Sequence, residues 1–268
     1  MGELHIKMKE LTTMISGLGS VAVAFSGGVD SSFLAAVAVR ALGEKAVAVT
    51  AFSETLAERE KEETIQIAKE IGIEHILLNI SELNSPEFVE NTVKRCYHCK
   101  KERFSVLGDW AKENGYNWVL EGSNGDDLSD YRPGMQAVKE LERVKSPLLE
   151  VGFTKDEIRE KSKEWGLSVW NKPSAACLSS RVAYGLSITA ERLNQIEKGE
   201  ELVKKFCSGQ VRVRHHGDMA RIEVESENIG IVTRAEIAST LDRGLKEIGF
   251  TYVTVDLAGY RMGSMNNF

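Results

Sequence analysis

Val21-Ala22-Val23-Ala24-Phe25-Ser26-Gly27-Gly28-Val29-Asp30-Ser31-Ser32 is the stretch of sequence that decides the fold. Its five leading apolar residues predict a short buried strand, and an alanine-, leucine- and valine-rich helix is expected over residues 31–42. A strand that runs through such a turn into a helix gathers free backbone N–H groups and the positive end of a helix dipole at one point. That arrangement attracts phosphate.

The turn itself contains two adjacent glycines, which let the backbone approach an anion with no Cβ in the way. Asp30 indicates a divalent cation, because a carboxylate beside phosphates is tolerable mainly when a cation such as Mg²⁺ bridges them. No Gly-Lys-Ser/Thr ends the stretch, so it is not a Walker loop. The alternative is a tight turn that binds nothing.

Outward from this turn, short apolar runs alternate with helical patterns, which predicts an α/β fold with a doubly wound, mainly parallel sheet. Helices are expected over residues 1–18, 56–71 and 96–114, and strands over residues 46–52, 75–80 and 118–121. A loop over residues 122–134 follows the last of these strands, at the kind of position where open α/β sheets bind ligands. Thr154 is expected to cap a helix that runs to Trp165, with Glu157 completing a capping box.

The last part of the chain has a different pattern. Residues 171–185 lack periodicity, which is typical of a functional loop. A helix, two strands, a helix and a strand follow. We therefore expect one domain over residues 1–185 and a smaller α+β domain over residues 186–268.

Composition restricts the partners. The chain has 268 residues, a net charge of -6 and 42% hydrophobic residues, which is ordinary for a soluble protein. Neither half is basic, so nucleic-acid binding is not favoured. No signal peptide or run of roughly 20 apolar residues is seen, so we expect a cytoplasmic protein. Its four cysteines are then expected to be reduced, metal-binding or catalytic.

The fingerprint S-G-G-x-D-S matches at Ser26 to Ser31, and the chain resembles the PP-loop, or N-type ATP pyrophosphatase, superfamily. Members cut ATP between its α and β phosphates and place AMP on a substrate oxygen. The resemblance implies ATP and Mg²⁺ as cofactors, with Asp30 holding the metal. It implies nucleotide contacts from Ser26, Gly27, Gly28, Val29, Asp30, Ser31 and Ser32, and by fold analogy from Phe52 and Ser53.

The loop after the fourth expected strand carries Asp126, Asp127 and Asp130. Acidic loop residues are usually just solvated. Since this loop should open near the phosphate turn, Asp127 is the residue that we expect to contact nucleotide or magnesium.

Five further segments, taken in their order, resemble the LarE family of ATP-dependent sulfur transferases. They are Glu121 to Asp127, Tyr131 to Gly134, Lys172 to Arg181, Arg212 to Arg214 and Gly259 to Ser264. This resemblance covers nearly the whole chain. It implies that carboxylates of pyridinium-3,5-biscarboxylic acid mononucleotide are adenylated and become thiocarboxylates in nickel-pincer cofactor synthesis. It also implies a homo-oligomer, either a trimer or a hexamer.

Cys177 lies where single-cysteine LarE proteins carry the cysteine that gives up its own sulfur and becomes dehydroalanine. Arg181 would favour its thiolate, and Ser180 and Arg181 are candidate substrate contacts. The chain departs from this pattern by carrying Cys96-x-x-Cys99. A subset of the family is thought to use three cysteines to hold a 4Fe-4S cluster whose open iron carries hydrosulfide, so Cys96, Cys99 and Cys177 are predicted to do so here. A zinc half-site or two plain thiols are the alternatives for Cys-x-x-Cys.

Arg212 and Arg214 alternate on one face of a predicted strand. In a solvated sheet they would have no special role, whereas the LarE resemblance implies that they grip the substrate's phosphate. Glu200, Glu201 and Glu223 either line the same cavity or lie on the surface. Cys207 ends an apolar helical face and is expected in the core.

Two rival functions stay open. A tRNA thiolase of the same superfamily would share the phosphate loop and the cysteines, but it would need an extended basic surface that the sequence does not offer. A non-catalytic nucleotide sensor would bind ATP without releasing pyrophosphate. The sequence leaves open whether hydrosulfide, Cys177 itself or a partner protein donates the sulfur.

Overall fold

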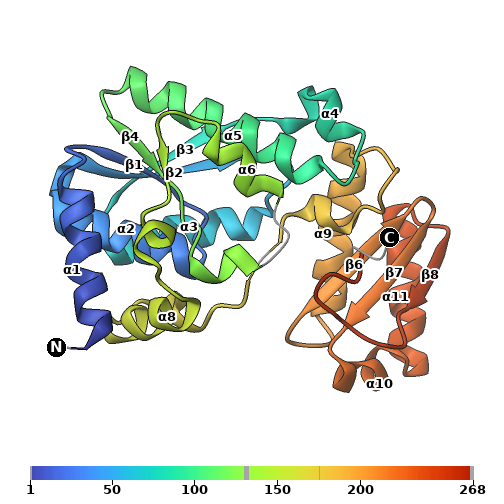
Figure 1. Cartoon of the computed structure of the whole chain (residues 1–268). Coiled ribbons are helices and arrows are strands. Elements are labelled where there is room, and N and C mark those ends of the chain that lie inside the picture. Colours follow the sequence, from blue (N-terminus) through green and yellow to red (C-terminus); the bar gives the residue numbers. More distant parts are fainter. Residues whose placement is uncertain (1, 130–132, 175, 266–268) are drawn as a thin grey trace. The chain divides into compact units, whose positions relative to one another are not determined.

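A five-stranded sheet organises the first part of the chain (Figure 1). The computed structural model describes residues 2–129, 133–174 and 176–265. The strand order is β3-β2-β1-β4-β5, and every neighbouring pair is parallel. The strands are β1 (Val21–Ala24), β2 (Ala46–Phe52), β3 (Glu74–Asn79), β4 (Trp118–Leu120) and β5 (Val144–Lys145). The predicted α/β fold with a parallel sheet is therefore confirmed; β5 was not predicted, because two residues carry no periodicity.

Both faces of this sheet are covered by helices. One face carries α1 (Glu3–Ser16), α2 (Val29–Leu42), α3 (Glu58–Ile71) and α8 (Lys155–Glu164), and the other carries α5 (Arg95–Glu113) and α6 (Pro133–Lys139) (Figure 1). Along β1, Val21 and Val23 pack into the core under α2, whereas Ala22 packs into the core under α5. Two buried faces explain why β1 reads as an unbroken apolar run.

The order of the strands places a switch point next to β1. The chain runs from β1 outward through β2 and β3, and then returns to the other side of β1 for β4 and β5. In open parallel sheets, ligands bind outside the carboxyl ends of the strands at such a point. The turn after β1 lies there.

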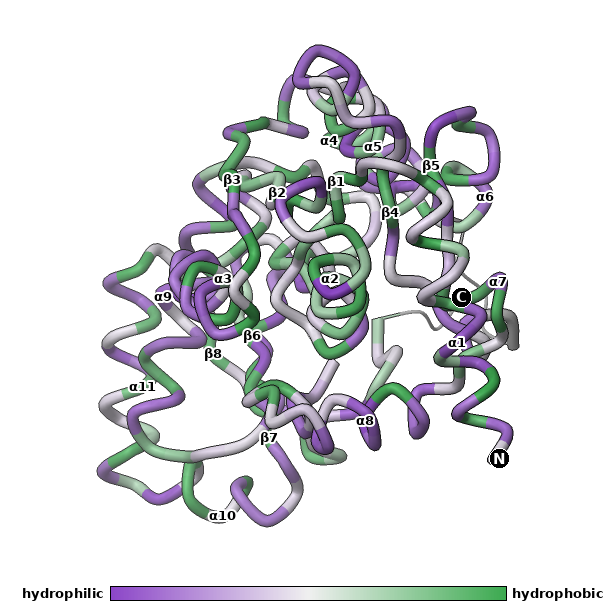
Figure 2. Tube along the Cα trace, turned by 90° about the vertical axis from the view of Figure 1, so that its left-hand side faces the viewer, coloured by the Kyte–Doolittle hydropathy of each residue, from purple (hydrophilic) through white to green (hydrophobic). Residues whose placement is uncertain are grey.

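Helix α2 is the most buried helix of this unit. Its residues from Val29 to Ala38 are buried apart from the half-buried Asp30, and Phe33 packs against the rings of Phe153 and Trp165. Figure 2 shows that α2 is a mainly hydrophobic helix. Its first turn therefore has a fixed direction relative to the sheet.

The second part of the chain forms a three-stranded mixed sheet. Strands β6 (Val211–His216) and β7 (Met219–Val224) are antiparallel, and β8 (Tyr252–Val255) pairs parallel with β7. Helices α9 (Ala190–Lys204) and α11 (Ala235–Ile248) pack on it around an apolar core that includes Cys207, which is 8% exposed. The small α+β unit and the core position of Cys207 were both predicted. The short helices α4 (Pro86–Val89), α7 (Pro147–Val151) and α10 (Ile229–Val232) were not.

The chain divides into two compact units, of which one comprises Met1–Glu82 and Cys96–Ala175 and the other Leu83–Arg95 and Ala176–Phe268. The expected boundary at Gly185 does not coincide with this division. Asn91 explains part of the difference. This residue is fully buried and has a backbone φ of 57°. Its side-chain amide donates to the carbonyls of Ala183 and Leu186 at 2.9 Å each. These bonds attach the segment that begins at residue 83 to the later unit.

None of the helices within the described ranges has the length and apolar character needed to cross a bilayer.

The capping box at α8 is present as predicted: the Thr154 hydroxyl accepts from the Glu157 N–H, and the Glu157 carboxylate accepts from the Thr154 N–H. Replacing Thr154 by alanine removes the hydroxyl that accepts from the Glu157 N–H, so this amide donor at the helix start loses its side-chain partner. We expect Thr154→Ala to lower the free energy of unfolding by about 1 kcal/mol in urea titrations. Ser239→Ala, at an exposed position of α11, is the control and should change it by less than about 0.5 kcal/mol. Equal losses in both variants would contradict this role for the cap.

Candidate functional site

The turn between β1 and α2 is built to receive an anion. Gly27 adopts a left-handed conformation at φ 64°, and Gly28 caps α2 in an extended conformation, with no side chain capping the helix. The Ser31 hydroxyl accepts from the Ser26 N–H and donates to the Gly28 carbonyl, at 3.2 Å in each case. The loop is thus closed on itself by its own serines, and the first turn of α2 supplies free amide donors and a positive dipole end.

Asp30 lies in the first turn of α2 among polar groups from elsewhere in the chain. The Lys155 ammonium forms an ion pair with its carboxylate, and the Asn124 amide donates to it at 3.2 Å. Asn124 is itself held by Asp127, whose carboxylate accepts from the Asn124 N–H at 3.0 Å. Because the Asp30 carboxylate already pairs with the Lys155 ammonium, it is accessible to a cationic group.

The aspartates of the loop after β4 lie in different surroundings. Asp127 is 7% exposed and lines the pocket next to the phosphate turn, where contact with nucleotide or magnesium was predicted. Asp126 instead accepts from the Lys155 N–H at 2.8 Å, at the start of α8. Asp130 lies outside the described residues, as do Tyr131 and Arg132.

A pocket of about 290 Å³ opens at the carboxyl ends of β1, β2 and β4. Its walls include the phosphate-loop residues Ser26, Gly28, Asp30 and Ser31, together with Thr50, Ala51, Leu56, Arg103 and Gly122. Phe52 and Ser53, predicted as nucleotide contacts, do not line this pocket in the described structure. Ser53 accepts from Arg103, which does line it, at 3.0 Å, and the Lys61 ammonium lies 4.3 Å from the centre of the Phe52 ring. Val29 and Ser32 are buried in α2. Gly122 is required for close approach, because a Cβ there would lie 3.2 Å from the Ser31 nitrogen.

The Cys-x-x-Cys pair begins α5. Cys96 is exposed and Cys99 is half-buried, and three residues apart on a helix they share one face. The Cys99 thiol donates to the buried carboxylate of Glu82 at 3.6 Å, and Arg103 donates to the same oxygen at 2.5 Å. Although burial raises the pKa of Glu82, the charge of Arg103 prevails and holds it below its usual value. Within the described ranges, no three His, Cys, Asp or Glu side chains gather as a metal site.

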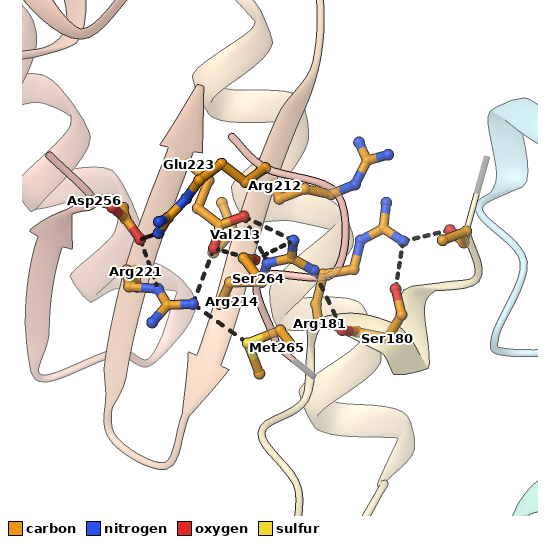
Figure 3. Close-up of polar contacts among 12 residues, drawn as sticks. Ser180, Arg181, Arg212, Val213, Arg214, Arg221, Glu223, Asp256, Ser264 and Met265 are labelled. Atoms are coloured by element: carbon orange, nitrogen blue, oxygen red, sulfur yellow. Dashed lines mark hydrogen bonds and ion pairs between the residues drawn. The ribbon is translucent and has the colours of Figure 1, made fainter. Parts of the chain in front are cut away.

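The second unit gathers arginines around two buried carboxylates, Glu200 and Glu223, of which Figure 3 labels Glu223. Arg214 is paired with Glu223 at 2.7 Å, and Arg221 binds the other oxygen of Glu223 at 2.9 Å. Arg181 is paired with Glu200 at 2.9 Å. Glu200 and Glu223, left open by the sequence, are therefore buried ion-pair partners, whereas Glu201 is exposed.

Arg212 differs from these neighbours because, among the described residues, no carboxylate forms an ion pair with it. Its guanidinium donates to the Val211 carbonyl at 2.7 Å and lies 5.2 Å from the centre of the Tyr260 ring, yet the residue is only 8% exposed. Burial lowers its pKa, and the charge of Arg181 lowers it further. A buried guanidinium that lacks an anionic partner is costly. The site therefore favours an anionic ligand.

The Cys177 segment lies next to this cluster in the same unit. Cys177 is half-buried, and its carbonyl accepts from Arg181 and from the Ser180 hydroxyl at 2.8 Å each. Arg181 thus contacts the backbone of Cys177 and not its thiol in this structure. Ser180, Arg181, Arg212 and Arg214, predicted as substrate contacts, come together, since Arg214 also donates to the Ser180 carbonyl at 3.3 Å.

Sequence reasoning assigned no role to several residues of the site, although Asn124 and Lys172 lie in segments that carry the LarE resemblance. Lys155, Lys172, Asn124 and Arg103 reach it from distant parts of the chain. Lysines and arginines occur at 34 positions, so composition alone could not single them out. The capping box at Thr154 was the one local signal that pointed to any of these residues, because it places Lys155 at the first position of α8.

Known proteins resemble this chain along its length. A family described as NAD synthase matches residues 7–109. An uncharacterised protein of Synechocystis is 41% identical over 98% of both chains. The pyridinium-3,5-bisthiocarboxylic acid mononucleotide synthase of Lactiplantibacillus plantarum is 35% identical over 100% of this chain and 96% of its own. A tRNA-specific 2-thiouridylase of Rickettsia africae is 26% identical over 68% of this chain and 60% of its own.

His215, which follows Arg214 on β6, gives the second unit a pH dependence. It is 3% exposed, and burial, aided by the charges of Arg192 and His216, lowers its pKa from 6.5 to about 4. Below pH 6.5 the unfolded chain takes up a proton that the folded chain excludes, so stability falls as the pH drops toward 4. We expect His215→Gln to reduce this loss by up to about 1.4 kcal/mol per pH unit in urea titrations between these values. An unchanged slope in the variant would contradict the assignment.

Proposed function

This chain belongs to the LarE family of ATP-dependent sulfur transferases, and we propose that it converts carboxylates of pyridinium-3,5-biscarboxylic acid mononucleotide to thiocarboxylates. The full-length similarity to a pyridinium-3,5-bisthiocarboxylic acid mononucleotide synthase supports this substrate. The product would serve nickel-pincer cofactor synthesis. The reaction has two steps, adenylation of a carboxylate oxygen with loss of pyrophosphate and displacement of AMP by sulfur.

The first unit is suited to the adenylation step. The loop from Ser26 to Ser32 would hold the departing pyrophosphate on backbone amides, because charge develops there as the bond between the α and β phosphates breaks. Asp30 and Asp127 offer carboxylate oxygens, the donors that Mg²⁺ prefers, so the residues fit this ion. When bound, Mg²⁺ would neutralise phosphate charge. Lys155, which forms an ion pair with Asp30 in this structure, would lie close to the same phosphate groups.

The second unit is suited to hold the substrate. Arg212 carries the proposal, because it is a buried cation with no ion-pair partner in the part of the chain that the structure describes, and its chemistry matches a phosphate monoester. Arg214 and Arg181 stand beside it, each already neutralised by its own glutamate. A mononucleotide phosphate would supply the anion that the cluster needs.

Sulfur chemistry is assigned to Cys177, with Cys96 and Cys99. In the sacrificial route the Cys177 sulfur attacks the acyl adenylate and displaces AMP, which gives a thioester. Loss of the Cys177 α proton to a base and cleavage of its Cβ–S bond then leave dehydroalanine on the protein and a thiocarboxylate on the substrate. In the cluster route, the thiolates of Cys96, Cys99 and Cys177 would hold a 4Fe-4S centre, which would supply sulfur as hydrosulfide when bound. The shared helical face of Cys96 and Cys99 supports the cluster.

The test is to combine purified protein, Mg·ATP and the pyridinium substrate and to measure pyrophosphate, thiocarboxylate and intact-protein mass. Sulfur transfer predicts pyrophosphate release that depends on the substrate. A mass loss of about 34 Da after one turnover indicates sacrifice of Cys177. About four irons per chain after anaerobic reconstitution, with no mass loss, indicates the cluster. ATP binding without pyrophosphate release would support the sensor instead.

The tRNA thiolase has weaker support, since the relative from Rickettsia africae shares only 26% identity and 60% of its length with this chain. Salt-sensitive binding of tRNA would favour it.

Arg212→Met should separate binding from stability. We expect the KM for the mononucleotide to rise about thirtyfold, roughly 2 kcal/mol, because a charge-assisted contact to phosphate is lost. The melting temperature without ligand should stay equal or rise, since a buried charge that no carboxylate neutralises is removed. Inorganic phosphate should stabilise the wild type and not the variant. Arg243→Met, exposed on α11, is the matched control and should change neither quantity.

If Arg212→Met lowers the melting temperature and leaves the KM unchanged, Arg212 has a structural role and the phosphate assignment fails.

A further inference from the structure

The peptide between Gly27 and Gly28 is held from one side by Lys172, the first residue of a LarE-like segment, to which sequence reasoning assigned no role. Lys172 donates from its ammonium to the Gly27 carbonyl at 3.0 Å. The Gly28 N–H points the other way, toward the Ser26 hydroxyl at 3.4 Å. Ser26 and Gly28 both line the nucleotide pocket. Since the carbonyl and N–H of a trans peptide point in opposite directions, a bond to the Gly27 carbonyl also fixes the direction of the Gly28 N–H.

This peptide has little stiffness of its own. Reversing it rotates ψ of Gly27 and φ of Gly28, and glycine populates positive and negative φ about equally. In the reversed form a carbonyl oxygen would face the phosphates and repel them. A glycine pair gives close approach to an anion, but it needs an outside contact to keep the N–H on the correct side.

Lys172 is well anchored for this task. It directly follows the 3-10 turn Ser168–Asn171, and its carbonyl accepts from Arg159 at 3.3 Å. Its ammonium also pairs with Glu63 of α3 at 2.8 Å. Burial raises the pKa of Glu63, but Lys172 and Arg59 together hold it below its usual value. The lysine is therefore held by an ionised partner and aimed at the loop.

We propose that Lys172 is a positioning residue that holds the Gly27–Gly28 peptide with its N–H toward the phosphates of ATP. The inference rests on the proposed role of the loop as the pyrophosphate site. Lys172 acts through the backbone of the loop and is not assigned any contact with substrate.

The first test compares ligands that do and do not use the loop. Lys172→Met should weaken binding of ATP and of inorganic pyrophosphate about tenfold, the loss of one charge-assisted hydrogen bond. Adenosine, which has no phosphate, should bind within about twofold of the wild type. Lys172→Arg should restore most of the ATP affinity. Lys161→Met is the matched control, because Lys161 is a lysine of similar burial that pairs with a glutamate, Glu164, at 2.6 Å within α8.

The second test blocks the reversed peptide by another route. Gly28 has φ -83°, which alanine adopts, and a Cβ there would lie 3.4 Å from the Ser26 hydroxyl, an ordinary contact. The reversed peptide would give residue 28 a positive φ, which alanine resists. In a Gly28→Ala background, Lys172→Met should therefore cost less than about threefold in ATP affinity.

The outcomes separate the inference from the function. Equal weakening of adenosine and ATP by Lys172→Met would mean a general structural defect, and unchanged ATP and pyrophosphate binding would remove the role; either result overturns the inference and leaves the proposed function in place. Equal losses from Lys172→Met in the wild-type and Gly28→Ala backgrounds would also overturn it. A wild-type protein that binds neither ATP nor pyrophosphate would overturn the proposed function as well.

Discussion

The packing of α2 against the parallel sheet is the constraint on which the first unit depends. Phe33, Leu34 and Val37 are at most 1% exposed, and each buried side chain of this size contributes about 1.5–3 kcal/mol. A helix held this firmly cannot turn its first amides away from the crevice beside β1. The site that we propose for pyrophosphate is therefore formed before any ligand arrives, and binding need not order it.

The anion sites that we propose in the two units rely on different physical means. In the first, neutral backbone amides do so, with Lys155 and Lys172 nearby and each paired with a carboxylate. In the second, charged guanidiniums are buried, and across the described ranges Arg212 has no carboxylate as an ion-pair partner. The first arrangement costs little stability when empty. The second carries a desolvation cost that an anionic ligand offsets, so occupancy and stability of the second unit are linked.

Helix α5 connects the pocket at the carboxyl ends of β1, β2 and β4 with the cysteine pair. Arg103, which lines this pocket, donates to Ser53, to Thr55 and to the buried Glu82, and Glu82 accepts from the Cys99 thiol. A buried carboxylate shared by a guanidinium and a thiol is a rigid contact, because removing either donor leaves a buried acceptor poorly satisfied. The pocket lining and Cys99 are thus linked by one polar network within the first unit.

The sequence by itself determined the parallel α/β fold, the phosphate turn and the small α+β unit, because strand and helix periodicities and the glycine-serine turn are local properties. The capping box at Thr154 and the core position of Cys207 were local in the same sense. Only the tertiary structure decided that Lys155 and Lys172 reach the loop across separations of 125 and 145 residues, and that Arg212 keeps a buried charge while Arg181 and Arg214 are paired. Such contacts depend on the chain topology and on which charged groups are buried next to one another. The spacing of neighbouring residues in the sequence determines neither.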